Sequence, residues 1–169
     1  MRRTLFESLI HGPFTEPPAV AGDPEIARMA AALNAQARHR LGRSLALRLV
    51  DAGSCNGCEL ELNALANPYY DLERFGLRFV ASPRHADVLL VTGPVTRNMR
   101  TALLRTHAAM PAPKWVVAIG DCATCGGLYG ESYACEAGVA AVLPVDLRIG
   151  GCPPSPAHLL EGLTALLAR

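Results

Sequence analysis

One stretch of the chain decides its fold, residues 45–59, which read LALRLVDAGSCNGCE. The first part, residues 45–50, is a short, largely apolar run of the kind that forms a buried β-strand. The second part separates Cys55 from Cys58 by two residues in a short loop. Both thiols can therefore point at one ion or cluster, and Gly57 lets the backbone fold tightly around it. The stretch predicts a strand that ends in a pair of metal-type ligands.

Two further cysteines follow the same pattern farther along the chain. Cys122 comes after the apolar run 114–119, and Cys152 comes after the run 145–149. Parallel strands end at a common edge of their sheet, and ligands of such sheets bind outside that edge. We therefore expect three strand ends to bring four thiols together, those of Cys55, Cys58, Cys122 and Cys152.

The composition is that of a globular protein with no marked surplus of charge. The chain has 169 residues, of which 50% are hydrophobic and 18% are charged, with a formal net charge of +1. This length is sufficient for one domain with a substantial core and an appendage. The absence of a basic surplus argues against a nucleic-acid partner, and the low charge indicates a surface partly covered by partner proteins.

The N-terminus and the cysteine content bear on the compartment. Six cysteines without a secretory segment argue against a disulfide scaffold. The first six residues, MRRTLF, resemble a twin-arginine export signal, but charged residues and prolines interrupt the apolar stretch that should follow. No run reaches the roughly 18 apolar residues that span a bilayer. We expect a cytoplasmic protein without a signal peptide or a transmembrane helix.

Strand-like and helix-like segments alternate along the chain. Strands are expected over residues 45–50, 77–81, 87–92, 114–119 and 145–149, and helices over 23–39, 59–75 with a break near Pro68, 96–110 and 155–167. Residues 120–138 are expected to be irregular, with at most one helical turn. This order predicts an α/β fold, a mostly parallel sheet with helices on both faces. Residues 1–22 are expected to form an N-terminal docking extension and linker, and residues 23–169 the domain.

The cysteines can also be grouped as two CxxC pairs, 55/58 and 122/125, which makes structural zinc the main alternative. Zinc ribbons separate their pairs by about 15–20 residues, whereas 63 residues intervene here. A [4Fe–4S] cluster uses four thiolates, and glycines and prolines commonly shape the loops around it. That cluster would leave Cys125 and Cys135 as buried, inert thiols.

Three motifs carry a family resemblance. Residues 51–59 (DAGSCNGCE), 120–123 (GDCA, followed by Gly126 and Gly127) and 151–154 (GCPP) resemble the small subunit of [NiFe]-hydrogenases and the homologous subunit of respiratory complex I. The closest resemblance is to energy-converting, membrane-associated hydrogenases, including the formate hydrogenlyase type. Complex I has adjacent cysteines where Asn56 and Gly57 separate them here. The chain also ends soon after its last expected helix, so one cluster is expected.

The resemblance implies a flavodoxin-like domain with one proximal [4Fe–4S] cluster held by Cys55, Cys58, Cys122 and Cys152. The cluster would relay electrons between ferredoxin-like clusters of another subunit and a large subunit, and only that large subunit would hold the nickel–iron centre. The assembly would include membrane subunits, with this chain peripheral on the cytoplasmic side, no nucleic acid, and no independent catalytic site. Two alternatives remain: the proximal-cluster subunit of a complex I-type quinone oxidoreductase, and a zinc-stabilised α/β scaffold.

A few other residues have weaker functional interpretations. Glu59 and Glu61 could carry protons, although carboxylates favoured at a helix start are the simpler explanation. Asp121 is expected to form an Asx turn beside its cysteine. The histidines show no ligand-like spacing. Three arginines on the helix expected over 96–110 indicate its solvated or partner-facing side: Arg97, Arg100 and Arg105.

Overall fold

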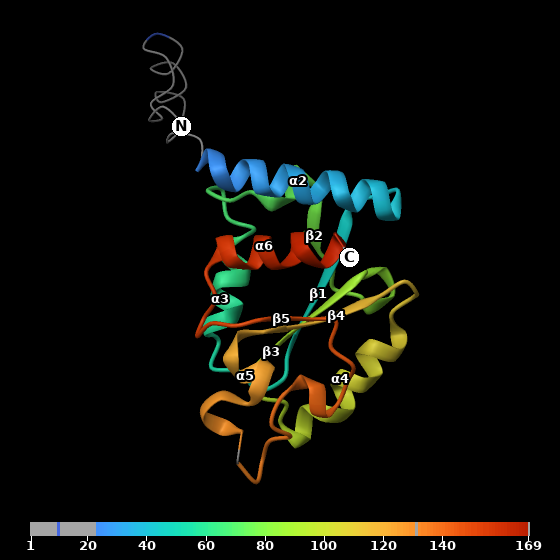
Figure 1. Ribbon diagram of the computed structural model, residues 1–169, viewed down its shortest axis with the longest axis vertical. Helices are drawn as coiled ribbons and strands as arrows, with labels where there is room; N and C mark the ends of the chain where they lie inside the picture. Colours follow the sequence, from blue (N-terminus) through green and yellow to red (C-terminus); the bar gives the residue numbers. More distant parts are fainter. Residues whose placement is uncertain (1–9, 11–22, 131, 169) are drawn as a thin grey trace.

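The computed structural model describes residues 10, 23–130 and 132–168 (Figure 1). The predicted extension over residues 1–22 therefore lies outside the described residues apart from Ile10. In Figure 1 the first described helix, α2 (Pro24–Leu41), lies at one end of the molecule, and α5 (Gly120–Cys125) lies toward the other.

A five-stranded sheet forms the centre, and every strand pair in it is parallel. The strand order is β2-β1-β3-β4-β5, the order of flavodoxin-like sheets. The strands are β1 (Leu45–Asp51), β2 (Leu77–Phe79), β3 (Val88–Thr92), β4 (Trp115–Ile119) and β5 (Leu147–Ile149). The predicted α/β fold with a parallel sheet is confirmed.

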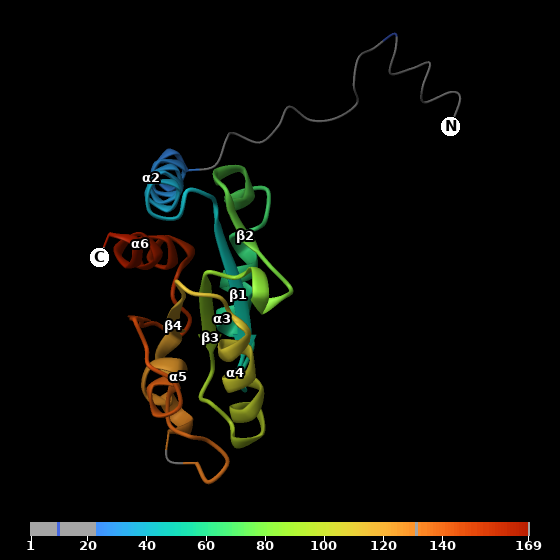
Figure 2. The ribbon, with the colours of Figure 1, turned by 90° about the vertical axis from the view of Figure 1, so that its right-hand side faces the viewer.

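Helices cover both faces of this sheet, as predicted. One core packs α2, α3 (Gly57–Ala64) and α6 (Pro156–Leu167) against side chains such as Leu47 and Leu90. The second core packs α4 (Arg97–Ala109) against alternate strand residues such as Leu89 and Val91. Figure 2 shows α2 and α6 together on one side of the sheet. All five residues of β3 are buried, which explains its continuous apolar run.

The helix ends follow local sequence signals. The Asp23 carboxylate accepts a hydrogen bond from the backbone N–H of Glu25 (2.9 Å), and Gly42 ends α2 in the left-handed region, with φ of 69°. The Ser155 hydroxyl accepts a hydrogen bond from the backbone N–H of His158 at the start of α6. Both predicted helix starts are confirmed.

The helical segment expected over residues 59–75 is broken before Pro68, as predicted, and its first part is shorter than expected. It begins at Gly57 and ends at Ala64, and only a short 3-10 helix, η1 (Leu72–Phe75), follows. Between them the Asn67 side chain accepts hydrogen bonds from the backbone N–H groups of Tyr69 and Tyr70. Pro68 breaks the helix and Asn67 stabilises the turn, so the segment does not continue to Phe75 as one helix.

The remaining short elements are single turns. They are the 3-10 helices η2 (Pro83–His85), η3 (Gly127–Tyr129) and η4 (Val139–Ala141). The predicted irregular segment over residues 120–138 thus contains the short helix α5 and the turn η3.

A buried carboxylate joins the first strand to the third. Asp87 is 1% exposed, and its Oδ2 accepts hydrogen bonds from the backbone N–H of Ala46 and the guanidinium of Arg43, both at 2.9 Å. We expect Asp87→Asn to lower the free energy of unfolding by about 2 kcal/mol, because a charged acceptor in a buried network is lost. Urea denaturation measures this. Asp71→Asn is the control, since Asp71 is 43% exposed in its ion pair and should change stability by less than about 0.5 kcal/mol. Equal effects of the two substitutions would contradict the prediction.

Candidate functional site

The four predicted cysteines line one cavity of about 90 Å³ at the carboxyl edge of the sheet. Cys55 lies in the loop after β1, and Cys58 in the first turn of α3. Cys122 lies in α5, directly after β4, and Cys152 lies in the loop after β5. Three strand ends therefore do bring these thiols together. The side chains of Cys55 and Cys152 are exposed, whereas those of Cys58 and Cys122 are half-buried.

Glycines give the thiols the space that they occupy. A Cβ atom on Gly120, whose φ is +83°, would lie 2.6 Å from Sγ of Cys58. A Cβ atom on Gly127 would lie 2.9 Å from Sγ of Cys122. Both distances are far below van der Waals contact, so a larger residue at either position would displace a thiol. The cavity therefore depends on glycine at these two positions, because a side chain there would occupy the space of a thiol.

Two aspartates hold the loops that carry the cysteines. Asp51 Oδ1 accepts hydrogen bonds from the backbone N–H groups of Gly53 and Ser54, both at 2.7 Å. Asp121 Oδ1 accepts a hydrogen bond from the backbone N–H of Gly151 (2.8 Å), and the Asp121 N–H donates to the Gly151 carbonyl (3.0 Å). Asp121 thus has the structural role that we expected, but its side-chain bond reaches a loop 30 residues away instead of closing a local turn.

Burial and mutual repulsion disfavour free thiolates in this cavity. The pKa of the Cys58 thiol is raised to about 12, chiefly by burial and in addition by the negative charges of Glu59 and of the other three thiolates. Burial also raises the pKa of the Cys122 thiol, with Cys152 and Cys55 adding to the effect. Several thiolates can share this space only beside a positive charge that offsets their repulsion, which is the situation created by bound metal ions.

Glu59 lies at the third position of α3, in the first turn, where the helix dipole favours a carboxylate. It is 6% exposed; Oε2 accepts a hydrogen bond from the Ser54 hydroxyl (2.6 Å), and Oε1 has no hydrogen-bond partner among the described residues. Sequence reasoning did not identify Ser54 or Gly93, which both line the thiol cavity. The Gly93-Pro94 dipeptide directly after β3 is the signal that could have indicated the latter.

The two remaining cysteines lie outside the cavity wall. Cys125 was expected to be buried, and this prediction is wrong: the residue is exposed because it ends α5, and the chain turns away at Gly126. Cys135 is half-buried. Within the described residues, no group of three or more histidine, cysteine or acidic side chains converges on a single-ion site. The three arginines of the α4 region are exposed, as predicted: Arg97, Arg100 and Arg105.

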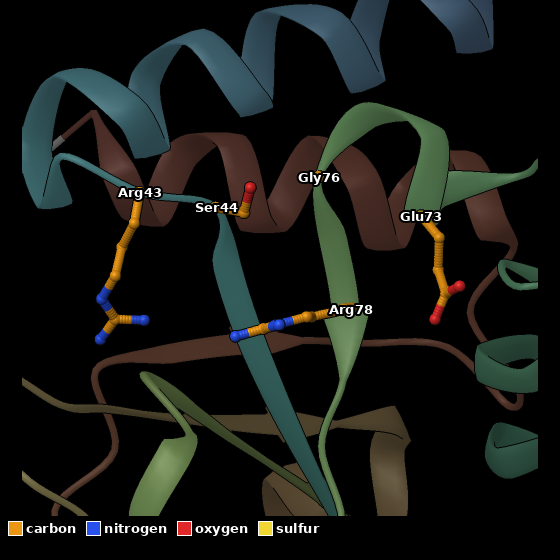
Figure 3. A pocket seen from close by; sticks show the side chains of 5 residues that line it. All are labelled: Arg43, Ser44, Glu73, Gly76 and Arg78. Atoms are coloured by element: carbon orange, nitrogen blue, oxygen red, sulfur yellow. The ribbon is translucent and has the colours of Figure 1, made fainter.

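A larger pocket, of about 380 Å³, lies at the opposite end of the strands (Figure 3). Arg43, Ser44, Glu73, Gly76 and Arg78 line it at the start of β1 and around β2. The Arg43 guanidinium is already bonded to Asp87. Doubly wound sheets bind their ligands at the carboxyl ends of strands. The smaller thiol cavity is therefore the candidate functional site.

Fold and site together define a class, that of flavodoxin-like α/β domains which present a group of cysteines from the carboxyl ends of parallel strands. Within it, the chain belongs to the family of the NADH ubiquinone oxidoreductase 20 kDa subunit, whose sequence profile matches residues 55–166. The matched region starts at Cys55 and includes all four cavity cysteines. Members of this family carry a [4Fe–4S] cluster.

Individual relatives agree with the resemblance of the motifs. The chain is 44% identical over 145 residues to formate hydrogenlyase subunit 7 of Escherichia coli (strain K12), which covers 86% of this chain and 55% of that protein. It is 45% identical over 129 residues to the probable membrane-bound hydrogenase subunit mbhJ of Pyrococcus furiosus, which covers 76% of this chain and 77% of that protein. The chain thus spans about half of the first relative and three quarters of the second.

A solved structure confirms the fold. The chain resembles a subunit in the structure of the membrane-bound sulfane sulfur reductase, an archaeal respiratory membrane complex. The TM-score is 0.67 at 33% identity, and the match covers 82% of this chain and 74% of the other. In the described part of this chain itself, none of the helices has the length and apolar character that crossing a bilayer requires.

Proposed function

We propose that this chain is the electron-transfer subunit of a membrane-associated [NiFe]-hydrogenase-like complex and that it holds one proximal [4Fe–4S] cluster. Cys55, Cys58, Cys122 and Cys152 would be its ligands. The observation that carries the proposal is that three strand ends place these four thiols around one cavity. The similarity to formate hydrogenlyase and membrane-bound hydrogenase subunits supports the type of complex.

The residues present fit a cluster of several ions. The donor set is four thiols, which is the usual ligand set of a [4Fe–4S] cluster. These thiols surround a cavity, so there is room between them for a group larger than one ion. Gly120 and Gly127 leave the clearance that the sulfur atoms of Cys58 and Cys122 need. When bound, the cluster would supply reversible one-electron transfer.

The surface next to the cavity fits a site that is completed by partners. Leu128 is 96% exposed and Tyr129 is 50% exposed, and both directly follow Gly127 beside the Cys122 thiol. Leu60, in the helix that carries Cys58, is 61% exposed. A partner on these apolar side chains would exclude water from the exposed Cys55 and Cys152, and cluster potentials depend on such exclusion. We propose that a large subunit and a ferredoxin-like subunit flank the site, with membrane subunits beyond and the nickel–iron centre in the large subunit.

A complex I-type quinone oxidoreductase is the second candidate, and the description of the family favours it. Asn56 and Gly57 between the first two cysteines favour the hydrogenase branch instead, as do the two relatives. The zinc scaffold is less well supported, because the cavity wall contains Cys152 and omits Cys125.

The test is anaerobic isolation of the chain with its partners, followed by iron, sulfide, zinc and nickel analysis and EPR after reduction. We expect about four irons per chain and the signal of a reduced cluster. Nickel in a co-purified large subunit would separate the hydrogenase from the quinone reductase. Stoichiometric zinc without iron would contradict the cluster and support the scaffold.

A further inference from the structure

The hydroxyl of Ser54 joins the two backbone positions that flank Cys55. It donates a hydrogen bond to Oε2 of Glu59 (2.6 Å) and accepts one from the backbone N–H of Asn56 (2.9 Å). Cys55 lies between Ser54 and Asn56, so the residue before it and the residue after it are tied to the same oxygen atom. The loop around this thiol is closed through one side chain.

Glu59 provides the fixed end of this connection. The carboxylate is 6% exposed and belongs to α3, whose next residue, Leu60, donates its backbone N–H to the Asn56 carbonyl (3.1 Å). Hydrogen bonds to a carboxylate are shorter and stronger than those between neutral groups. The hydroxyl of Ser54 is therefore anchored on the helix that also carries Cys58.

The backbone of Ser54 is held from two other directions. Its N–H donates to Asp51 Oδ1 at the end of β1, and Gly93, after β3, lies so close that an added Cβ atom would be 2.5 Å from the Ser54 nitrogen. Ser54 thus connects two strand ends to α3. Asn56, on the other side of Cys55, adopts a left-handed φ of 71°, a conformation that asparagine tolerates better than most residues other than glycine.

We propose that Ser54 and Glu59 form a positioning pair that fixes the Cys55 thiol in the orientation needed to hold the cluster. This inference rests on the proposed function. Cys55 needs the pair because its side chain is exposed and is therefore not enclosed by the core. The other exposed ligand, Cys152, has separate support, because its loop is held by Asp121 through Gly151.

Two removals and two conservative replacements test the pair in the complex isolated anaerobically with its partners. Ser54→Ala removes the hydroxyl and Glu59→Leu removes its acceptor, whereas Ser54→Thr and Glu59→Gln keep them. Glu61→Leu is the control on the same helix, since Glu61 is half-buried and lies outside the cavity wall. The measurements are the rate of iron release to a chelator and, by mass spectrometry, the order in which iodoacetamide alkylates the cysteines.

We expect Ser54→Ala and Glu59→Leu to release iron about tenfold faster, the effect of losing one charge-assisted hydrogen bond. In both variants Cys55 should be alkylated before Cys152, because only the first ligand loop is loosened. Ser54→Thr and Glu61→Leu should stay within about twofold of the wild type. Glu59→Gln keeps an acceptor oxygen but loses its charge, so its rate should lie between those of the wild type and Glu59→Leu. The proposal would be overturned if Ser54→Ala and Glu59→Leu both released iron at the wild-type rate. It would also be overturned if all four cysteine ligands were alkylated at the same rate.

Absence of iron from the wild-type complex would count against the proposed function. A second measurement tests the positioning pair separately from the cluster. Hydrogen exchange at the Asn56 amide, measured on the full chain without a cluster, reports how often the loop around Cys55 opens. The pair predicts about tenfold faster exchange in Glu59→Leu at this amide and unchanged exchange at the Gly151 amide, which Asp121 holds. Unchanged exchange at Asn56 would overturn the pair whatever the metal content.

Discussion

Replacing Cys152 with alanine is expected to reduce the iron content from about four atoms per chain to less than about one, whereas Cys125→Ala should leave it unchanged. Cys152 lines the thiol cavity, and Cys125 lies outside the cavity wall, three residues after Cys122. A cluster that loses one of its four thiolates has an open iron site at the protein surface. The measurement is iron and sulfide content together with the EPR signal of the reduced protein, isolated anaerobically with its partners.

The two substitutions form a matched pair, because both residues are exposed cysteines on loops or helix ends and neither contributes to the buried cores. The melting temperatures of both variants, measured without a cluster, should therefore stay near that of the wild type. The zinc alternative predicts the opposite result, since it pairs Cys122 with Cys125. Iron retained in Cys152→Ala and lost in Cys125→Ala would contradict the ligand assignment.

The parts of the fold that were predicted from the sequence depend on short-range patterns. The start of α2 at Asp23 and its end at Gly42 are set within a few residues, and four consecutive apolar side chains, residues 88–91, indicate the buried strand β3. The position of the site was also predicted from the sequence pattern, because a cysteine a few residues after a strand-forming apolar run lies at the carboxyl edge of a parallel sheet. The gathering of the four cysteines needed only this rule and the strand order.

What the sequence did not predict depends on contacts between distant segments. The bond from Gly151 to Asp121 and the approach of Gly93 to Ser54 join residues 30 and 39 positions apart. Neither leaves a periodic signal. The burial of Glu59 was also not predictable, since an acidic residue at a helix start is ordinarily solvated.

The approach of Gly93 to Ser54 leads to the second large effect. Gly93→Ala is expected to lower the free energy of unfolding by about 3 kcal/mol, the sum of backbone strain and overpacking. The φ of Gly93 is +77°, and an added Cβ atom would lie 2.5 Å from the nitrogen and 2.7 Å from the Cα of Ser54. Backbone atoms cannot rotate away as a side chain can, so the loop that carries Cys55 must shift. Urea denaturation and iron content measure the two consequences.

Gly42→Ala separates strain from steric conflict. Gly42 has a similar φ of +69°, but a Cβ atom there would meet no atom within 4 Å. This control should cost only the left-handed strain, about 1 kcal/mol, and should leave the iron content unchanged. The difference between the two variants then measures how firmly β3 is packed against the first ligand loop. Equal destabilisation by the two alanines, with iron retained in both, would show that the loop yields without cost and that Gly93 does not shape the site.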